Sequence, residues 1–240
     1  MNRRTTIQFV CATFVLLGIV LWLDRSGLAT QLMLSATVWL LLAIVFVRHR
    51  ELARETLIAI AIATTGEIIL SIGLGIYGYR SGGVPLYVPP GHGVVYLCAL
   101  QASAQLRRYE RLIVVTTFSA GTIAAFGAAL LFNDTFGLAC WLVTLLIATT
   151  TDRRLLIATC ISLTSILEIA GTWAGNWTWH ERQGLLASGN PPVGVVLLYC
   201  CLDLLTLMAL NALMRRRQNA ACTSATSSDE TSDSTGLQAA

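Results

Sequence analysis

The sequence of 240 residues contains no lysine and few charged residues of any kind. Charged side chains make up 12% of the chain, about half of the roughly 25% that is typical of soluble domains. Apolar residues make up 55%, and the mean hydropathy is +0.68. The charges are clustered between long apolar runs. This composition excludes an ordinary soluble domain and predicts an integral membrane protein in contact with a lipid bilayer.

Several chemical signatures are also missing. The chain has no phosphate-binding glycine loop, no nucleophile elbow and no paired-histidine motif. Six of its seven cysteines lie inside apolar runs without metal-ligand spacing, so we expect small core residues. We therefore expect no metal and no cofactor. The basic residues form short clusters that fit membrane topology, so nucleic acid is not expected as a partner.

Apolar segments follow one another along most of the chain, and most approach the ~20 residues that a spanning helix needs. Because the bilayer admits only helices or closed barrels, and no alternation of period two is present, we predict an all-α polytopic protein. We expect about eight transmembrane helices, over Thr6–Leu23, Leu28–Val47, Thr56–Tyr79, Pro90–Leu106, Leu112–Phe132, Thr135–Thr150, Leu155–Trp177 and Pro191–Leu213.

The arginines favour one side of the membrane. Thirteen of the sixteen flank the segment ends that share a side with the N-terminus, and only Arg25, Arg80 and Arg182 flank the opposite ends. Because positive residues stay in the cytoplasm, we expect a multi-pass protein of the inner (plasma) membrane with both termini cytoplasmic. No small-x-small cleavage site follows the first segment, so we expect that segment to be retained.

The two halves of the chain share a pattern, which predicts two parallel four-helix repeats at residues 1–111 and 112–217. Tyr77–Tyr79 reads YGY and Trp177–Trp179 reads WTW. Four further pairs lie 101 or 102 positions apart, namely Glu67 and Glu168, Pro90 and Pro192, Cys98 and Cys200, and Gln101 and Asp203. The remaining segment, 218–240, is rich in Ser, Thr and Ala and is expected to be a disordered cytoplasmic tail.

Three acidic residues, Glu67, Glu168 and Asp203, lie within the apolar segments. A carboxylate at mid-bilayer costs at least about 2.5–3.5 kcal/mol, and no arginine lies within a segment to neutralise it. Burial without a cation disfavours the charged form, so at least one acid is expected to be protonated. These acids are the candidate catalytic residues, as proton donors or carriers. Alternatively, each could be protonated and stabilise helix packing through hydrogen bonds.

Aromatic and polar residues near the opposite membrane surface are candidates for substrate binding, although an interfacial aromatic belt also explains some of them. Asn190 and Pro191 resemble a helix start, with a cap and then a preset φ, so the positive end of that helix would face the loop. The candidate binding residues are Tyr77, His92, Gln101, Trp173, Trp177, Trp179, Asn190 and Tyr199.

The motif GTWAGNWTW at 171–179, followed by GNPP at 189–192 and an apolar helix, resembles integral-membrane carotenoid cyclase and hydratase domains. Small membrane terpene cyclases are similar in using a helix-borne Glu and Asp to protonate an alkene or epoxide. The resemblance implies a cyclase- or hydratase-type lyase or isomerase of isoprenoid metabolism, with Glu67, Glu168 and Asp203 as its acids. The chain departs from the cyclase pattern where PPVG replaces a proline followed by adjacent glutamates.

Three classes of function remain open on the sequence. The first is an enzyme that uses a buried carboxylic acid as general acid on an apolar isoprenoid or lipid. The second is a proton-linked transporter or lipid-handling protein, which the repeat favours. The third is a membrane subunit without chemistry. The asymmetry between Gln101 and Asp203 favours a single site and hence the enzyme.

Overall fold

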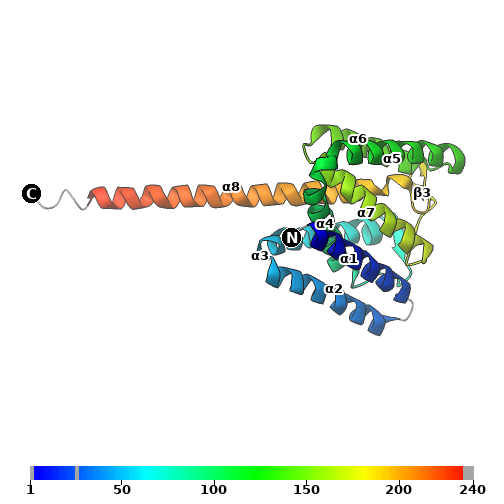
Figure 1. The fold of residues 1–240 in the computed structure, drawn as a ribbon, viewed down its shortest axis with the longest axis horizontal. Coiled ribbons are helices and arrows are strands. Elements are labelled where there is room, and N and C mark those ends of the chain that lie inside the picture. Colours follow the sequence, from blue (N-terminus) through cyan, green and yellow to red (C-terminus); the bar gives the residue numbers. More distant parts are fainter. Residues whose placement is uncertain (1–2, 25–26, 235–240) are drawn as a thin grey trace, which may run out of the picture.

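The computed structural model describes residues 3–24 and 27–234, and the side chains between residues 4 and 215. The described chain is mostly helical (Figure 1). Its α-helices are α1 (Arg3–Leu23), α2 (Leu28–Arg48), α3 (Arg50–Glu67), α4 (Val88–Leu106), α5 (Glu110–Phe132), α6 (Thr135–Thr150), α7 (Arg154–Trp173) and α8 (Val196–Ser234). Shorter turns are η1 (Ile68–Gly73), η2 (Arg107–Tyr109) and η3 (Val193–Val195). The prediction of an all-α protein is thus confirmed.

Most of these helices are long and apolar enough to cross a membrane. Among the described residues there are six such stretches, one of which, Val88–Phe132, contains both α4 and α5. The apolar helix α6 is shorter, with 16 residues. A membrane protein is therefore supported by both length and composition.

The helices pack around a central group. Helix α4 packs between α3 and α7, and α8 packs against the same two helices. Figure 1 shows α1 and α2 on one side of this group and the pair α5 and α6 on the other. Close approach of α3 and α4 depends on Gly93, because a Cβ built there would lie 2.5 Å from Cγ1 of Ile60.

Two short β-ribbons lie beside the helix ends. Strand β1 (Tyr77–Tyr79) pairs antiparallel with β2 (Trp177–Trp179), so that Tyr77 faces Trp179 and Tyr79 faces Trp177. Strands β3 (Arg182–Gln183) and β4 (Leu186–Ala187) form a hairpin in the following loop. Because β1 follows η1 and β2 follows α7, the first ribbon fixes the ends of these two elements against each other.

A buried aspartate holds the loop and the start of α8 in place. Asp134 precedes α6, and its carboxylate accepts hydrogen bonds from the backbone N–H groups of Gly137 (2.9 Å), Gly189 (2.9 Å) and Val193 (2.8 Å). The bonds from Gly137 and Val193 satisfy donors at the beginnings of α6 and η3, which would otherwise lack partners, and the bond from Gly189 holds the loop between β4 and η3.

The beginning and the end of α8 differ from expectation. The side chain of Asn190 accepts a hydrogen bond from the N–H of Trp179 (2.9 Å) and does not cap α8, which begins at Val196 after η3. The predicted cap at Asn190 is therefore wrong, because the carboxylate of Asp134 already accepts the Val193 N–H. At its other end, α8 continues as a helix to Ser234, into the tail expected to be disordered from residue 218.

Candidate active site

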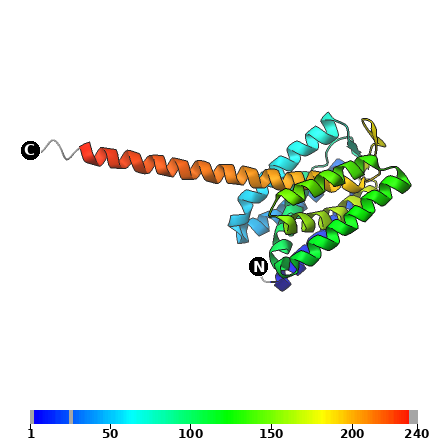
Figure 2. The ribbon, with the colours of Figure 1, turned by 90° about the horizontal axis from the view of Figure 1, so that it is seen from above.

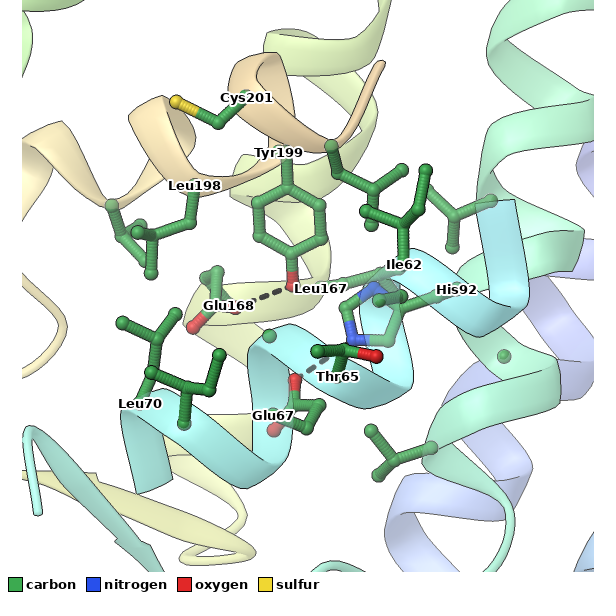
Figure 3. Close-up of a pocket in the computed structure, with 18 of the residues that line it drawn as sticks. Ile62, Thr65, Glu67, Leu70, His92, Leu167, Glu168, Leu198, Tyr199 and Cys201 are labelled. Carbon is green, nitrogen blue, oxygen red and sulfur yellow. Dashed lines mark hydrogen bonds and ion pairs between the residues drawn. The ribbon is translucent and has the colours of Figure 1, made fainter. Parts of the chain in front are cut away.

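A cavity of about 960 Å³ lies among α1, α3, η1, α4, α7, α8 and the β1–β2 ribbon. Most of its walls are apolar, with residues such as Leu17, Ile62, Leu70, Leu167 and Leu198. Its lining includes seven of the residues that the sequence singled out, and Figure 3 labels Glu67, His92, Glu168 and Tyr199 among them. The seven are Glu67, Tyr77, His92, Glu168, Trp177, Trp179 and Tyr199. The cavity is therefore an apolar chamber with a localised group of titratable and aromatic side chains.

Glu67, the last residue of α3, is 7% exposed and is held by three side chains. Its Oε2 accepts hydrogen bonds from the hydroxyls of Tyr77 and Tyr79, each at 2.7 Å. Its Oε1 lies 2.9 Å from Nε2 of His92 on α4. Both tyrosines come from β1, so the ribbon brings the donors to a carboxylate that lies about ten residues earlier in the chain.

Glu168 on α7 is 5% exposed and has a different set of partners. Its Oε1 accepts a hydrogen bond from the Tyr199 hydroxyl of α8 (2.7 Å), and its Oε2 accepts one from the indole N–H of Trp177 (3.0 Å). Both partners are neutral donors, whereas Glu67 has a histidine beside it. The two carboxylates of one cavity thus lie in chemically distinct environments.

The two carboxylates belong to one polar group. The ring centre of His92 lies 5.5 Å from the ring centre of Tyr199, so the partner of Glu67 contacts the partner of Glu168. Figure 3 shows Tyr199 extending from α8 toward Glu168, with His92 and Glu67 on the neighbouring helices. Residues from α3, α4, α7 and α8 therefore meet at this point of the cavity.

The β1–β2 ribbon forms an aromatic wall. Tyr77 packs on Trp179 with ring centres 4.6 Å apart, and Tyr79 packs edge-on against Trp177 at 6.0 Å. Burial raises the pKa of the Tyr77 and Tyr79 hydroxyls, and the nearby Glu67 carboxylate raises it further. Both phenols thus stay protonated and donate to Glu67. The buried indole N–H of Trp179 has no hydrogen-bond partner among the described residues.

A glycine permits the position of Trp177. A Cβ built at Gly171 on α7 would lie 2.0 Å from Cη2 of Trp177, so the indole packs against the helix at a position where only a hydrogen atom fits. This contact places the indole N–H at Glu168, which is one helical turn earlier in α7. Within GTWAGNW, Gly171 therefore leaves the space that the indole of Trp177 occupies.

Four of the sequence candidates do not line the cavity. Gln101 lies at a separate, smaller pocket between α1, α2, α3 and α4. Trp173 is 79% exposed at the end of α7, and Asn190 binds the backbone of β2. Asp203 is 1% exposed on α8, and neither of its carboxyl oxygens accepts a hydrogen bond from an oxygen or nitrogen donor among the described residues.

Asp203 lies in a second group of polar residues, one turn along α8 from Tyr199. The thiol of Cys160 on α7 lies beside it, and Asp203 also interacts electrostatically with Glu55 on α3 and Tyr96 on α4. The Tyr96 hydroxyl donates a hydrogen bond to the Glu55 carboxylate. The structure thus brings Glu67 and Glu168 together at the cavity and leaves Asp203 outside it.

Sequence reasoning missed a polar cluster near the end of α1, next to the cavity residue Tyr87. The Tyr87 hydroxyl donates to Asp24 (2.7 Å), and Arg80 donates to the side-chain oxygen of Asn176 (3.0 Å) and lies 3.8 Å from Asp24. Asn176, which is fully buried, also donates to the Leu21 carbonyl (2.8 Å). Arg80 and Asp24 are charged residues at segment ends, and their pairing across 56 positions has no short-range signal in the sequence.

The chain matches no protein-family model, and no curated protein and no solved structure matches it, so the interpretation of the cavity depends on its own residues.

Proposed function

We propose that this protein is a membrane enzyme that protonates an apolar isoprenoid or lipid substrate, with Glu168 as general acid. The observation that carries the proposal is the placement of Glu67, His92, Glu168 and Tyr199 in one large apolar cavity. Binding sites for small molecules combine apolar walls with a few converging polar groups. General acid catalysis contributes on the order of 100- to 10,000-fold in rate.

The environments of the two acids suggest a division of roles. Glu168 has only neutral donors as partners, and removal of a carboxylate from water without a cation favours its protonated form. Glu67 has His92 beside it, and this pair can hold or accept a proton. We assign Glu168 as the proton donor and Glu67 with His92 as the acceptor.

The reaction follows from these roles. The proton of Glu168 is transferred to one carbon of a substrate C=C bond, and the π electrons form the new C–H bond. The neighbouring carbon becomes a cation, which the ring faces of Tyr77, Trp177 and Trp179 can stabilise. Loss of a proton from the cation to Glu67 and His92 completes an isomerisation or cyclisation. In a hydration, water adds to the cation and the resulting oxonium loses its extra proton to the same pair. Return of that proton from the pair to Glu168 restores the starting state.

The charge of the lining favours a neutral substrate. The ionisable residues that line the described cavity include two glutamates, a histidine and tyrosines but no arginine. A phosphate or diphosphate group would therefore meet like charge and no bidentate partner. This supports a neutral isoprenoid or lipid, consistent with the resemblance to carotenoid cyclase and hydratase domains, and argues against a substrate with a charged head group.

We also propose eight spans arranged as two parallel repeats in the inner membrane, with both termini in the cytoplasm. The arginine distribution supports the orientation. The pairing of β1 with β2 supports the repeat, because the two strands that pair occupy equivalent positions in the proposed halves. Two equivalent segments related by a two-fold axis would meet in such an antiparallel, reciprocal pair.

A proton-linked transporter is the second candidate, and the reciprocal ribbon favours it because many transporters are built from repeats. The contacts of α3 with α8 and of α4 with α7 are likewise reciprocal between the proposed halves. Glu67 and Glu168 have different hydrogen-bond partners, and this difference favours the enzyme. A reaction that transfers one proton to the substrate and removes another uses a proton donor and a proton acceptor at one site.

Deuterium incorporation separates these candidates. Membranes or vesicles with the protein are incubated in D2O with a neutral lipid extract from cells that lack it, and lipids are compared by mass spectrometry. The enzyme is expected to give a product with deuterium bound to carbon, which does not exchange in H2O. Glu168→Gln should abolish this product, because the amide keeps the shape and has no transferable acidic proton.

The matched control is Glu51→Gln, an exposed glutamate near the start of α3 that does not line the cavity. It should incorporate deuterium at the wild-type rate. If the wild-type protein redistributes lipids or protons across the vesicle and forms no deuterated product, the transporter replaces the enzyme. If Glu168→Gln folds and retains the full rate of incorporation, Glu168 is not the proton donor.

A further inference from the structure

The exposed part of the cavity wall belongs to two elements. Lining residues from α1, α4, α7 and the β1–β2 ribbon are buried or half-buried. The lining residues that are exposed come from α3 with η1 and from α8, namely Ala61, Thr65, Ile69, Leu205, Met208 and Ala212. The cavity therefore opens to the surroundings through the gap between α3 and α8, which cross and contact each other (Figure 2).

This gap is apolar throughout. Among the described lining residues its only exposed polar side chain is Thr65, whose hydroxyl donates to the Ala61 carbonyl one turn earlier in α3 (2.9 Å) and so needs no other partner. Small side chains at Ala61, Ala209 and Ala212 leave room between the helices. Both helices belong to candidate membrane spans, so the gap opens toward hydrocarbon and not toward water.

The gap continues into a groove along α8. The lining residues Leu205, Met208, Ala209 and Ala212 repeat at the spacing of a single helix face. From Tyr199 at the carboxylates to Ala212, the helix rises about 20 Å, roughly two thirds of the hydrocarbon thickness of a bilayer. A chain with its reactive end at Glu168 therefore has an apolar path of this length for its tail.

We propose that the gap between α3 and α8 is the entrance of the site from the bilayer, and that an apolar tail of the substrate lies along α8 between Tyr199 and Ala212. The identity of the occupant as substrate rests on the proposed function, whereas the position of the entrance rests on the exposure of the lining residues. Other openings would require the buried residues of α1, α4 or α7 to move apart.

The experiment uses the full chain in phosphatidylcholine vesicles with a trace of a long-chain alcohol that carries a diazirine at the end of its chain. After irradiation, adducts are located by mass spectrometry of peptides. Adducts are expected on Met208, Ala209 or Ala212 of α8 and on the facing residues of α3. Ala212→Trp, at the exposed end of the groove, should lower the yield of these adducts several-fold, because the indole fills the groove.

Two further variants make the result specific. Ala61→Trp blocks the gap from α3 and should have the same effect as Ala212→Trp. Leu213→Trp places the same indole on α8 at an exposed residue that does not line the cavity, so it should leave the adduct yield unchanged. Adducts confined to other helices, or an adduct yield that both blocking variants leave unchanged, would overturn the proposal.

The labelling experiment tests the entrance and the deuterium experiment tests the enzyme, so either proposal can fail without the other. Adducts in the groove without any deuterated product would support the entrance and refute the enzyme. A deuterated product formed at an unchanged rate by folded Ala212→Trp and Ala61→Trp, with no adducts in the groove, would refute the entrance and leave the enzyme in place.

Discussion

The ring of His92 on α4 lies against the ring of Tyr199 on α8, with their centres 5.5 Å apart. His92 is the partner of Glu67 at 2.9 Å, and Tyr199 is the partner of Glu168 at 2.7 Å. This ring contact joins two carboxylates that are 101 positions apart in the sequence. A change in the protonation of one acid is therefore expected to affect the other through the two rings.

Tyr199→Phe tests this coupling. The variant keeps the ring contact with His92 and removes the hydroxyl that donates to Glu168. Loss of a hydrogen bond to an acidic group is expected to lower the rate of deuterium incorporation about tenfold or more, equivalent to about 1.4 kcal/mol. The dependence of the rate on pH should also shift, because Glu168 loses a partner.

The control for this change is Tyr109→Phe, at an exposed tyrosine in η2 outside the cavity. It should alter neither the rate nor its pH dependence. A Tyr199→Phe protein that has a lower folded yield but an unchanged pH profile would mean that the hydroxyl only stabilises helix packing.

Gly171→Ala should displace Trp177. The new Cβ would lie 2.0 Å from the indole, which must then move away from α7 and lose its hydrogen bond to Glu168. Such overpacking costs about 1–3 kcal/mol. Thermal unfolding in detergent should show this loss, together with a decrease in activity. Gly127→Ala on α5, where a Cβ would meet nothing within 4 Å, is the matched control and should be tolerated.

Asp134→Ala should be one of the more destabilising single changes in the protein. The carboxylate accepts hydrogen bonds from three backbone N–H groups, at the starts of α6 and η3 and in the loop before η3, and each would be left without this acceptor. We expect a loss of about 2 kcal/mol or more in the free energy of unfolding. The comparison is Asp152→Ala at an exposed aspartate. Equal unfolding temperatures for the two variants would contradict this role of Asp134.

The helices could be predicted from the sequence because long apolar runs in a membrane protein have few alternatives. The expected segment Thr135–Thr150 coincides with α6, and Leu28–Val47 differs from α2 by one residue. The start of α8 could not be predicted, because the acceptor for the N–H of Val193 is Asp134, a residue 59 positions away. Such long-range partners leave no local pattern in the sequence.

The same distinction holds for the site. The cost of placing a carboxylate in a bilayer identified Glu67 and Glu168, and the structure places both in the cavity. That argument treats all three acids alike, so it could not distinguish Asp203, which lies beside Cys160 and does not line the cavity. Tyr79 was missed as a partner of Glu67, since its contact requires the β1–β2 ribbon.

Membrane topology can be tested independently of chemistry. Reporter fusions at the C-terminus and in the β3–β4 hairpin near Gly184 should report opposite sides of the membrane, with the C-terminus in the cytoplasm. The expectation follows from the thirteen arginines on one side against three on the other. If both fusions report the same side, the arrangement of eight spans is wrong.

Asp203→Asn separates the sequence hypothesis from the geometry. Asp203 lies outside the cavity, and beside its carboxyl group lies the Cys160 thiol, a weak donor, with no hydrogen bond from an oxygen or nitrogen donor among the described residues. Replacing a buried carboxylate that lacks a strong partner removes a desolvation cost, so stability should be unchanged or higher. Glu168→Gln, in contrast, should lose on the order of 100- to 10,000-fold in rate.

The measurement compares folded yield, unfolding temperature and deuterium incorporation for Glu67→Gln, Glu168→Gln and Asp203→Asn. We expect Asp203→Asn to retain most of the rate. If it instead folds normally and loses as much as Glu168→Gln, Asp203 belongs to the path that delivers the proton, as the sequence alone suggested.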